Sequence, residues 1–234
     1  MRLSKRLRTV AGMVPKCRAV ADVGCDHGYL GVWLLREGVA GYAYEMDVRS
    51  GPLAKAAETI RFFHMQERAE TILSDGLIEL KPGRAEVIVM AGMGGELMTR
   101  LLTDGAEQAA SAECLVLQPQ SDPAMVRRRV YAAGFRIERE ECVFEDGKYY
   151  VAMKAVPNNP ADREMPYTET EFRYGRCLPA SKDITYLAYL TEECEKKVAM
   201  VERLLAAETA AAEERLATAA AELSELAGVI RGML

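Results

Sequence analysis

One segment constrains the fold of this chain more than any other: residues Val20–Leu30, with the sequence VADVGCDHGYL. A short apolar run ends there in a glycine-containing turn and continues into a helical pattern, as in the nucleotide-binding loop of an α/β fold. The loop carries Asp26 where a dinucleotide-binding loop has glycine or a neutral residue. A carboxylate at a helix N-terminus repels a pyrophosphate and attracts a cation. We therefore expect an α/β fold whose first loop receives a positively charged ligand.

The sequence that follows alternates between strand and helix patterns, which predicts a parallel sheet with helices on both faces. Two more strand patterns, 135–144 and 148–156, flank Glu145-Asp146-Gly147, a turn sequence that closes a hairpin. A dinucleotide-binding fold does not require this antiparallel pair, whereas the sheet of an S-adenosylmethionine (SAM)-dependent methyltransferase ends in one. The expected fold is α/β, a Rossmann-like, mostly parallel sheet with a terminal antiparallel hairpin. The predicted strands are 19–23, 41–46, 70–73, 86–90 and 113–117, and the helices are 29–37, 52–63, 94–102 and 123–133.

The C-terminal part is expected to be helical. Proline and asparagine at 157–160 interrupt the alternation, and we expect a linker over 157–182. Apolar positions 184, 187, 194, 198, 201 and 205 follow helical spacing, but 216, 223, 226 and 230 follow it in a displaced register. This favours two antiparallel helices that turn within 206–214, although one long helix stays an alternative. The expected domains are 1–156, a linker at 157–182 and a helical hairpin at 183–234.

Charge is distributed unevenly along the chain. The net charge is −5, yet residues 1–18 hold six basic residues and no acid, whereas Thr191–Leu234 holds nine Glu against five Lys or Arg. Apolar residues in the first segment recur at helical spacing, which predicts an amphipathic helix within 2–18. Its basic arc is expected to contact RNA phosphates, or else to be an ordinary solvated face. The apolar positions are Leu3, Leu7, Val10 and Val14, and the basic ones are Arg2, Lys5, Arg6 and Arg8.

Four segments fall at carboxyl ends of predicted strands, one directly after each of the first four strands. A ligand lies at these ends in such a fold. Each has glycines for close backbone approach or an acid that accepts hydrogen bonds, and together they predict a SAM site. Asp47 suits the ribose hydroxyls better than Glu45, and Asp75 suits an adenine amino group. The expected cofactor-binding residues are Asp22, Gly24, Cys25, Gly28, Asp47, Asp75, Gly76, Ala91, Gly92 and Met93.

Several motifs together resemble the bacterial tRNA (adenine-22-N1)-methyltransferase family, known as TrmK. They are Asp26–Leu30, Gly51–Leu53, Asp75–Leu77, Ala91–Gly95 and Leu117–Pro119. The resemblance runs from Leu3 to Gly175 and implies a class I methyltransferase domain, a coiled-coil extension of two helices and methyl transfer from SAM to N1 of a tRNA adenine. This chain departs from the family at Cys25, Gly28 and Gln120. Gln118, Pro119 and Gln120 are expected to contact the RNA base, and the departure at Gln120 falls within this segment.

Adenine N1 attacks through an in-plane lone pair, so it needs no prior deprotonation, but the product is a cation. We expect Asp26 to stabilise this charge, unless it only caps the following helix. His27 is a candidate base or phosphate contact, or a residue that stabilises the loop. Tyr29 is a candidate stacking residue, or a packing residue. Arg127–Arg129 is expected to be a solvated helix face.

Other features exclude functional classes. The six cysteines are scattered without metal-binding spacing, so we expect reduced thiols and no metal. No apolar run is long enough to span a membrane, and we expect a monomeric, cytoplasmic protein. An Asn/Asp-Pro-Pro-Tyr/Phe motif is absent from the sequence, which argues against methylation of an exocyclic amine. A SAM-dependent methyltransferase with another substrate and a non-catalytic SAM- or tRNA-binding module remain as alternatives.

Overall fold

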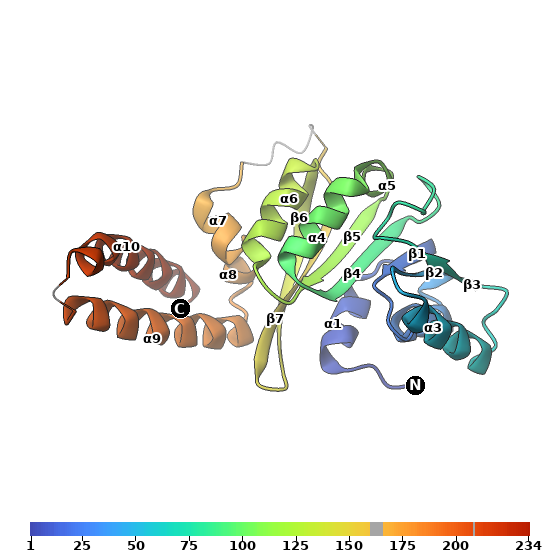
Figure 1. The fold of residues 1–234 in the computed structure, drawn as a ribbon, viewed down its shortest axis with the longest axis horizontal. Helices are drawn as coiled ribbons and strands as arrows, with labels where there is room; N and C mark the ends of the chain where they lie inside the picture. Colours follow the sequence, from blue (N-terminus) through green and yellow to red (C-terminus); the bar gives the residue numbers. More distant parts are fainter. Residues whose placement is uncertain (160–165, 208) are drawn as a thin grey trace. The chain divides into compact units, whose positions relative to one another are not determined.

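The computed structural model describes residues 1–159, 166–207 and 209–234. The chain divides into two compact units, Met1–Pro166 and Tyr167–Leu234 (Figure 1). We call them the sheet unit and the helical unit.

The sheet unit is built on a seven-stranded sheet with the order β3-β2-β1-β4-β5-β7-β6. The first five strands run parallel, and β7 pairs antiparallel with both β5 and β6. Strands in the middle of the sheet are covered on both faces, so they read as continuous apolar runs. The strands are β1 Cys17–Val23, β2 Ala40–Asp47, β3 Ala69–Leu73, β4 Val87–Met93, β5 Cys114–Pro119, β6 Phe135–Glu145 and β7 Lys148–Pro157.

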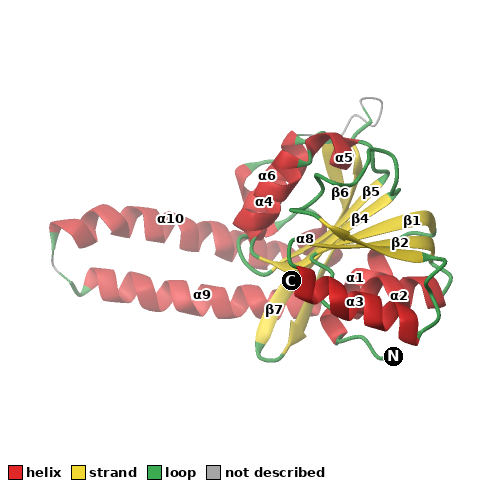
Figure 2. Ribbon diagram, turned by 45° about the vertical axis from the view of Figure 1, so that its right-hand side comes forward, coloured by secondary structure: helices red, strands yellow, loops and turns green. Residues whose placement is uncertain are grey.

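Helices cover both faces of this sheet, with α1, α2 and α3 on one side and α4, α5 and α6 on the other (Figure 2). Every predicted strand and helix between 19 and 156 is present, and its ends lie within three residues of the prediction. Asp146 and Gly147 both have positive φ, as the predicted hairpin turn requires. Helix α5 was not predicted. The helices are α1 Lys5–Met13, α2 Tyr29–Arg36, α3 Ser50–Phe62, α4 Gly95–Asp104, α5 Ala106–Ala110 and α6 Pro123–Ala132.

The N-terminal helix α1 is shorter than the predicted 2–18 segment. Ser4 caps its start, and Val14 adopts extended backbone because Pro15 follows it. Its apolar side packs as predicted, with Leu3, Val10 and Val14 buried. The predicted basic arc is only partly correct, because Arg6 turns away from solvent toward the sheet.

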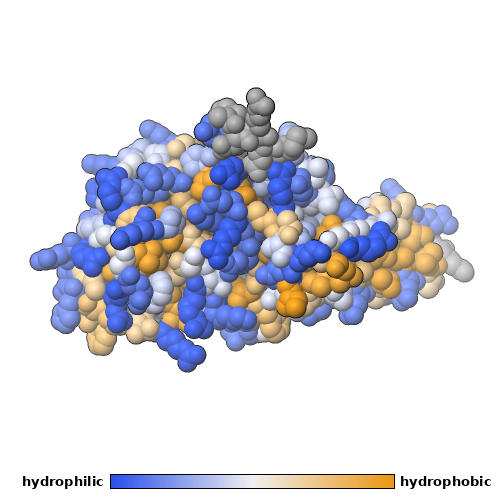
Figure 3. Space-filling model, turned by 180° about the vertical axis from the view of Figure 1, so that it is seen from behind, coloured by the Kyte–Doolittle hydropathy of each residue, from blue (hydrophilic) through white to orange (hydrophobic). Residues whose placement is uncertain are grey.

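The helical unit contains the predicted pair of antiparallel helices, which Lys197 and Glu222 bridge at 2.5 Å. The turn between them falls after Leu205, and residue 208 lies outside the described residues. The predicted apolar stripe is wrong in part, because Ile184 and Leu205 are exposed. A pair of helices buries only one narrow seam, so part of its apolar surface stays exposed, and Figure 3 shows apolar patches on the surface. The helices of this unit are α7 Glu169–Tyr174, α8 Cys177–Ser181, α9 Ile184–Leu205 and α10 Ala210–Met233.

The predicted 157–182 linker differs from the structure, since α7 and α8 lie within it. Thr168 and Glu171 form a capping box at the start of α7. Arg176 donates to Glu171 at 2.7 Å, and this contact lowers the pKa of the Glu171 carboxyl to about 2. Local capping therefore orders a segment in which apolar periodicity gave no helical signal. Residues 160–165 of the predicted linker lie outside the described residues.

The prediction of a solvated Arg127–Arg129 face is wrong for Arg127. Its side chain is 1% exposed and donates to Glu140 of β6, which is fully buried, at 2.7 Å. Arg129 donates to the carbonyl of Leu102. These contacts attach α6 to the sheet and to α4.

We expect Glu140→Gln to lower the free energy of unfolding by about 3 kcal/mol, because it removes the buried carboxylate to which Arg127 donates. Glu138→Gln on the same strand breaks a more exposed pair with Lys154 and is the matched control, with an expected loss below about 1 kcal/mol. Urea denaturation of both variants measures the difference. Equal losses would contradict the structural role of the buried pair.

Candidate active site

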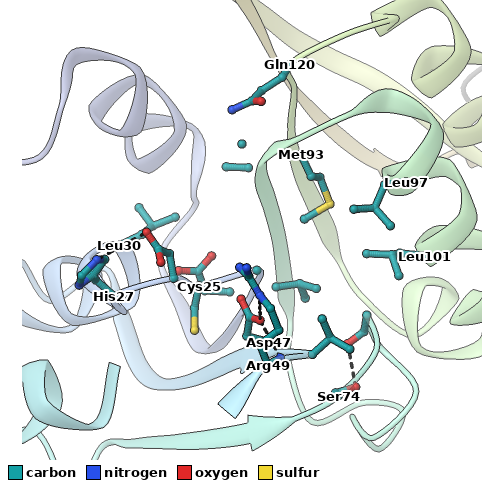
Figure 4. A pocket seen from close by; sticks show the side chains of 18 of the residues that line it. Cys25, His27, Leu30, Asp47, Arg49, Ser74, Met93, Leu97, Leu101 and Gln120 are labelled. Atoms are coloured by element: carbon teal, nitrogen blue, oxygen red, sulfur yellow. Dashed lines mark hydrogen bonds and ion pairs between the residues drawn. The ribbon is translucent and has the colours of Figure 1, made fainter. Parts of the chain in front are cut away.

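A hollow of about 690 Å³ lies at the carboxyl ends of β1, β2 and β4, where the strand order reverses (Figure 4). This is the position at which open α/β sheets bind ligands. Of the residues predicted to bind cofactor, only Gly28 does not line the hollow. Sequence analysis missed part of the wall, because apolar or basic residues after a strand carry no specific signal. The missed lining residues are Leu7, Val23, Leu30, Val48, Arg49, Ser74, Leu97, Arg100 and Leu101.

The loop after β1 places glycine backbone, which has no side chain, at the hollow. Gly24 has φ +78°, and a Cβ there would lie 3.1 Å from the Met93 methyl group. The backbone N–H groups of Gly24 and Cys25 donate to the carbonyl of Met46 and tie the loop to β2. Gly28 lies beneath the loop with φ +66°, where a Cβ would lie 3.0 Å from Ala56. Its role is therefore to let α2 approach α3.

Asp26 stands at the mouth of the hollow with its side chain 68% exposed. Its backbone is left-handed, with φ +48°. Helix α2 takes Gly28 as its N-cap and has no side-chain capping bond. The carboxylate of Asp26 is thus directed to the site and does not cap the helix. The alternative in which Asp26 only caps α2 is not supported.

His27 and Tyr29 form a stack beside Asp26. Their ring centroids are 5.2 Å apart and the planes differ by 2°. His27 Nε2 lies 3.7 Å from the Asp26 carboxylate. His27 therefore lies between Tyr29 and the Asp26 carboxylate, and both rings line the hollow.

Two predicted acids lie across the hollow and are held by arginines. Asp47 is buried at the end of β2 and accepts from the backbone N–H of Arg49 at 2.9 Å. Asp75 accepts two hydrogen bonds from Arg100, both at 3.0 Å, and this contact lowers the pKa of the Asp75 carboxyl. Both acids are fixed in place before any ligand arrives.

Beneath the loop lies a buried acid pair that sequence analysis did not assign. Asp22 and Glu45 are register partners on β1 and β2, and both side chains are buried. The Glu45 carboxyl lies next to the side chains of Asp22 and Cys25, and a Cβ at Gly31 would overlap it. Burial first, and then the charge of Asp22, raises the pKa of Glu45 well above its usual range. Burial also raises the pKa of Asp22, to about 7. We infer that the two buried carboxyls hold at least one proton at neutral pH, and that Glu45 carries it.

Cys25 lies beside this pair as a buried thiol. Burial and the nearby carboxylates of Asp22, Glu45 and Asp47 raise its pKa. It stays protonated and is unsuited to act as a nucleophile.

The opposite wall is formed by the end of β4. A bulge lies between Ala91 and Met93, with a φ of +80° at Gly92, and pairing with β5 resumes at Met93 and Pro119. A Cβ at Gly92 would lie 3.4 Å from an Arg6 nitrogen, so the bare backbone there leaves room for that side chain. The predicted approach of this backbone to a ligand stays a prediction.

Arg6 is fixed at the rim of the hollow. Its guanidinium donates to Gln118 Oε1 at 2.6 Å and lies 5.5 Å from the centroid of the Tyr150 ring. Gln118 and Pro119 are buried and do not line the hollow, whereas Gln120 does. Of these three residues, only Gln120 lines the hollow, and Gln118 contacts Arg6 at its rim.

The other predicted RNA contacts lie outside the hollow. Arg2 and Arg8 are exposed, and Lys5 donates to the carbonyl of Phe144. Glu145 accepts from the Lys5 backbone N–H, so an acid lies at the start of this basic arc. Within residues 1–159, 166–207 and 209–234, no group of three or more His, Cys, Asp or Glu side chains is placed to hold a metal. No helix among the described residues is long and apolar enough to cross a membrane.

Comparisons with known proteins agree with this geometry. Residues 3–153 match the family model described as a methyltransferase domain. The chain is 29% identical to the tRNA (adenine(22)-N(1))-methyltransferase of Bacillus subtilis, over 98% of both chains. The crystal structure of the B. subtilis m1A22 tRNA methyltransferase TrmK superposes with a TM-score of 0.88, at 28% identity over 98% of this chain and 99% of that one. A Streptococcus pneumoniae protein in complex with S-adenosyl-L-methionine gives a TM-score of 0.86, at 26% identity over 98% and 100% of the two chains.

The buried pair predicts a pH-dependent stability. Because the folded-state pKa of Glu45 is raised, its contribution to stability is complete below the unfolded pKa of about 4.3 and is lost as pH rises toward the folded value. Glu45→Gln removes this loss. Its free energy of unfolding relative to wild type should therefore rise between pH 5 and pH 8 by on the order of 1 kcal/mol.

Urea denaturation at several pH values measures this difference. Glu107→Gln removes an exposed acid on α5 and serves as the control. Parallel pH profiles for wild type and Glu45→Gln would contradict a neutral, buried Glu45.

Proposed function

This chain belongs to the methyltransferase-domain family, within its tRNA (adenine-22-N1)-methyltransferase group, and we propose that it transfers a methyl group from SAM to N1 of adenine 22 in tRNA. One observation carries the proposal: carboxylates from three successive strand ends surround a single hollow at the reversal of strand order. They are Asp22, Asp26, Asp47 and Asp75. A hollow with this charge favours a cationic ligand over a diphosphate.

The residues around the hollow fit SAM. Asp22 is placed to accept from the amino group of the methionine part, and Gly24 lets the backbone approach that part closely. Asp47 has acceptor oxygens for both ribose hydroxyls, and Asp75 has one for the adenine amino group. Met93, Leu97 and Leu101 supply apolar surface for the adenine ring. When bound, SAM supplies an electrophilic methyl group on a positively charged sulfur.

Asp26 acts on the base that accepts the methyl group. The N1 lone pair forms the new N–C bond while the C–S bond breaks, and the positive charge passes from sulfur to the adenine ring. The carboxylate of Asp26 stabilises that ring charge and accepts a hydrogen bond from N6, which holds N1 in line. His27, stacked on Tyr29, keeps Asp26 in place. No residue has to remove a proton from N1 before transfer.

The tRNA is held from the side of α1. A base inside folded RNA must be unstacked before it enters a pocket. We assign phosphate contacts to Arg2, Lys5 and Arg8, and place Arg6 and Gln120 next to the incoming nucleotide. Gln118 orients Arg6, and Pro119 ends β5 at that point.

The wider context follows from the same proposal. We propose a monomeric cytoplasmic enzyme that needs no metal, with the transfer site carried by the sheet unit. Two alternatives are a methyltransferase with another substrate and a binding module without activity. Incubation with labelled SAM and total RNA separates them, because only the proposed enzyme labels tRNA.

We expect Asp26→Asn to lower turnover on in-vitro transcribed tRNA about 100-fold, because charge stabilisation of the transition state is lost. Asparagine suits the left-handed backbone at this position, so the loop should be retained. Methylation is followed by label transfer and mapping of the modified nucleotide, and SAM affinity is measured separately. Unchanged turnover contradicts the role of Asp26, and loss of SAM binding assigns the residue to the cofactor.

We expect Arg2→Gln, Lys5→Gln and Arg8→Gln together to raise the tRNA KM, while the affinity for SAM stays at the wild-type value. The slope of log K against log salt should fall by roughly 0.7–0.9 for each phosphate contact removed. Lys81→Gln, an exposed charge between β3 and β4, is the control for loss of a positive charge. An unaltered salt slope would show that the basic arc is ordinary solvated surface.

A further inference from the structure

A second hollow of about 600 Å³ lies beside the active site. Tyr29 lines both hollows, so the ring that stacks on His27 is part of the wall between them. The second hollow has an aromatic wall and both signs of charge. It is lined by Met1, Arg2, Tyr29, Glu58, Thr59, Phe62 and Phe63.

Phe62 is unusually exposed for a large aromatic residue. The residue is 76% exposed, and Tyr29 is 44% exposed. Single exposed apolar residues are common, but aromatic rings gathered around one hollow mark an interaction site. Packing within the fold does not explain why the rings of Phe62 and Tyr29 lie at this surface.

The ring of Phe62 stands on a rigid base. It meets the Phe63 ring edge-on, with centroids 5.0 Å apart and planes at 83°. Phe63 packs against the hydrophobic core, and the guanidinium of Arg36 lies 4.9 Å from its centroid. Phe62 is also the last residue of α3 and does not belong to a loose loop. The aromatic surface formed by Phe62 and Phe63 therefore exists before any ligand binds.

The charges around this aromatic surface suit a nucleotide. Arg2 lines the hollow, and the Arg36 guanidinium lies over the Phe63 ring. Flat rings beside arginines are the usual surface for unpaired bases, which stack while their phosphates meet the cations. Glu58 adds an acceptor for an exocyclic amino group.

We propose that this hollow binds an unpaired base of the tRNA, next to the adenine that enters the active site. Extruding a base from a stacked strand leaves its neighbour without a stacking partner, and Phe62 replaces that partner. The proposal rests on the proposed function, because it requires an RNA substrate whose target base leaves the stack.

The test uses the full chain and in-vitro transcribed tRNA. Phe62→Leu keeps an apolar side chain but removes the aromatic face, and it should weaken tRNA binding about tenfold. Phe62→Tyr keeps the ring and should bind tRNA as wild type does. Tyr131→Leu replaces a partly exposed ring on α6, on the other face of the sheet, and should leave tRNA affinity unchanged.

A second readout reports stacking directly. Phe62→Trp places an indole in the hollow, and its fluorescence should be quenched by tRNA but not by SAM, after subtraction of the Trp33 signal of the wild-type protein. SAM affinity, measured for every variant, confirms that the active site is intact.

Each outcome decides the proposal. Wild-type tRNA affinity in Phe62→Leu overturns it, even where the enzyme methylates tRNA. Weak tRNA binding by both Phe62→Leu and Phe62→Tyr overturns base stacking, because the tyrosine variant still has an aromatic face. If the wild-type chain neither binds nor methylates tRNA, the proposed function fails and this inference fails with it.

Discussion

The concentration of carboxylates at the reversal of strand order is the constraint on which the rest of the structure depends. Asp22, Asp26 and Asp47 come from two adjacent strand ends and face one hollow, where they repel one another unless a cation binds or a proton is shared. Neighbouring groups reduce this repulsion. Glu45 carries a proton beneath Asp22, Arg49 binds Asp47, and Arg100 binds Asp75. The exposed Asp26 stands at the mouth of the hollow, where we propose that it faces the cationic base product.

The sequence predicted features whose signal is local or set by topology. The glycines at Gly24 and Gly92 mark positive φ angles, and Asp146-Gly147 marks a hairpin turn. Since the carboxyl ends of parallel strands meet at one edge, acids after successive strands could be brought together without knowledge of their contacts. For the same reason Asp47 and Asp75 were placed correctly at the hollow, although the arginines that hold them were not foreseen.

Partners distant in sequence could not be predicted. Arg127 looked solvated, because nothing in its own helix reveals Glu140 on β6. Periodicity placed Arg6 on a basic arc, yet its hydrogen bond with Gln118 holds its side chain at the rim of the active site. The exposure of Phe62 was equally hidden, since an aromatic residue at helical spacing is usually buried. Capping at Thr168 ordered a segment that composition marked as a linker. In each case the deciding interaction is tertiary or a side-chain cap, and neither appears in apolar periodicity.

The most direct test of this account is titration calorimetry of the whole protein with SAM and with an oxidised nicotinamide dinucleotide, for wild type and Asp47→Asn. The account predicts saturable binding of SAM by wild type, weakened about tenfold or more in Asp47→Asn, and no binding of the diphosphate-bearing dinucleotide. Binding of the dinucleotide in place of SAM, or equal SAM affinity in both proteins, would contradict it.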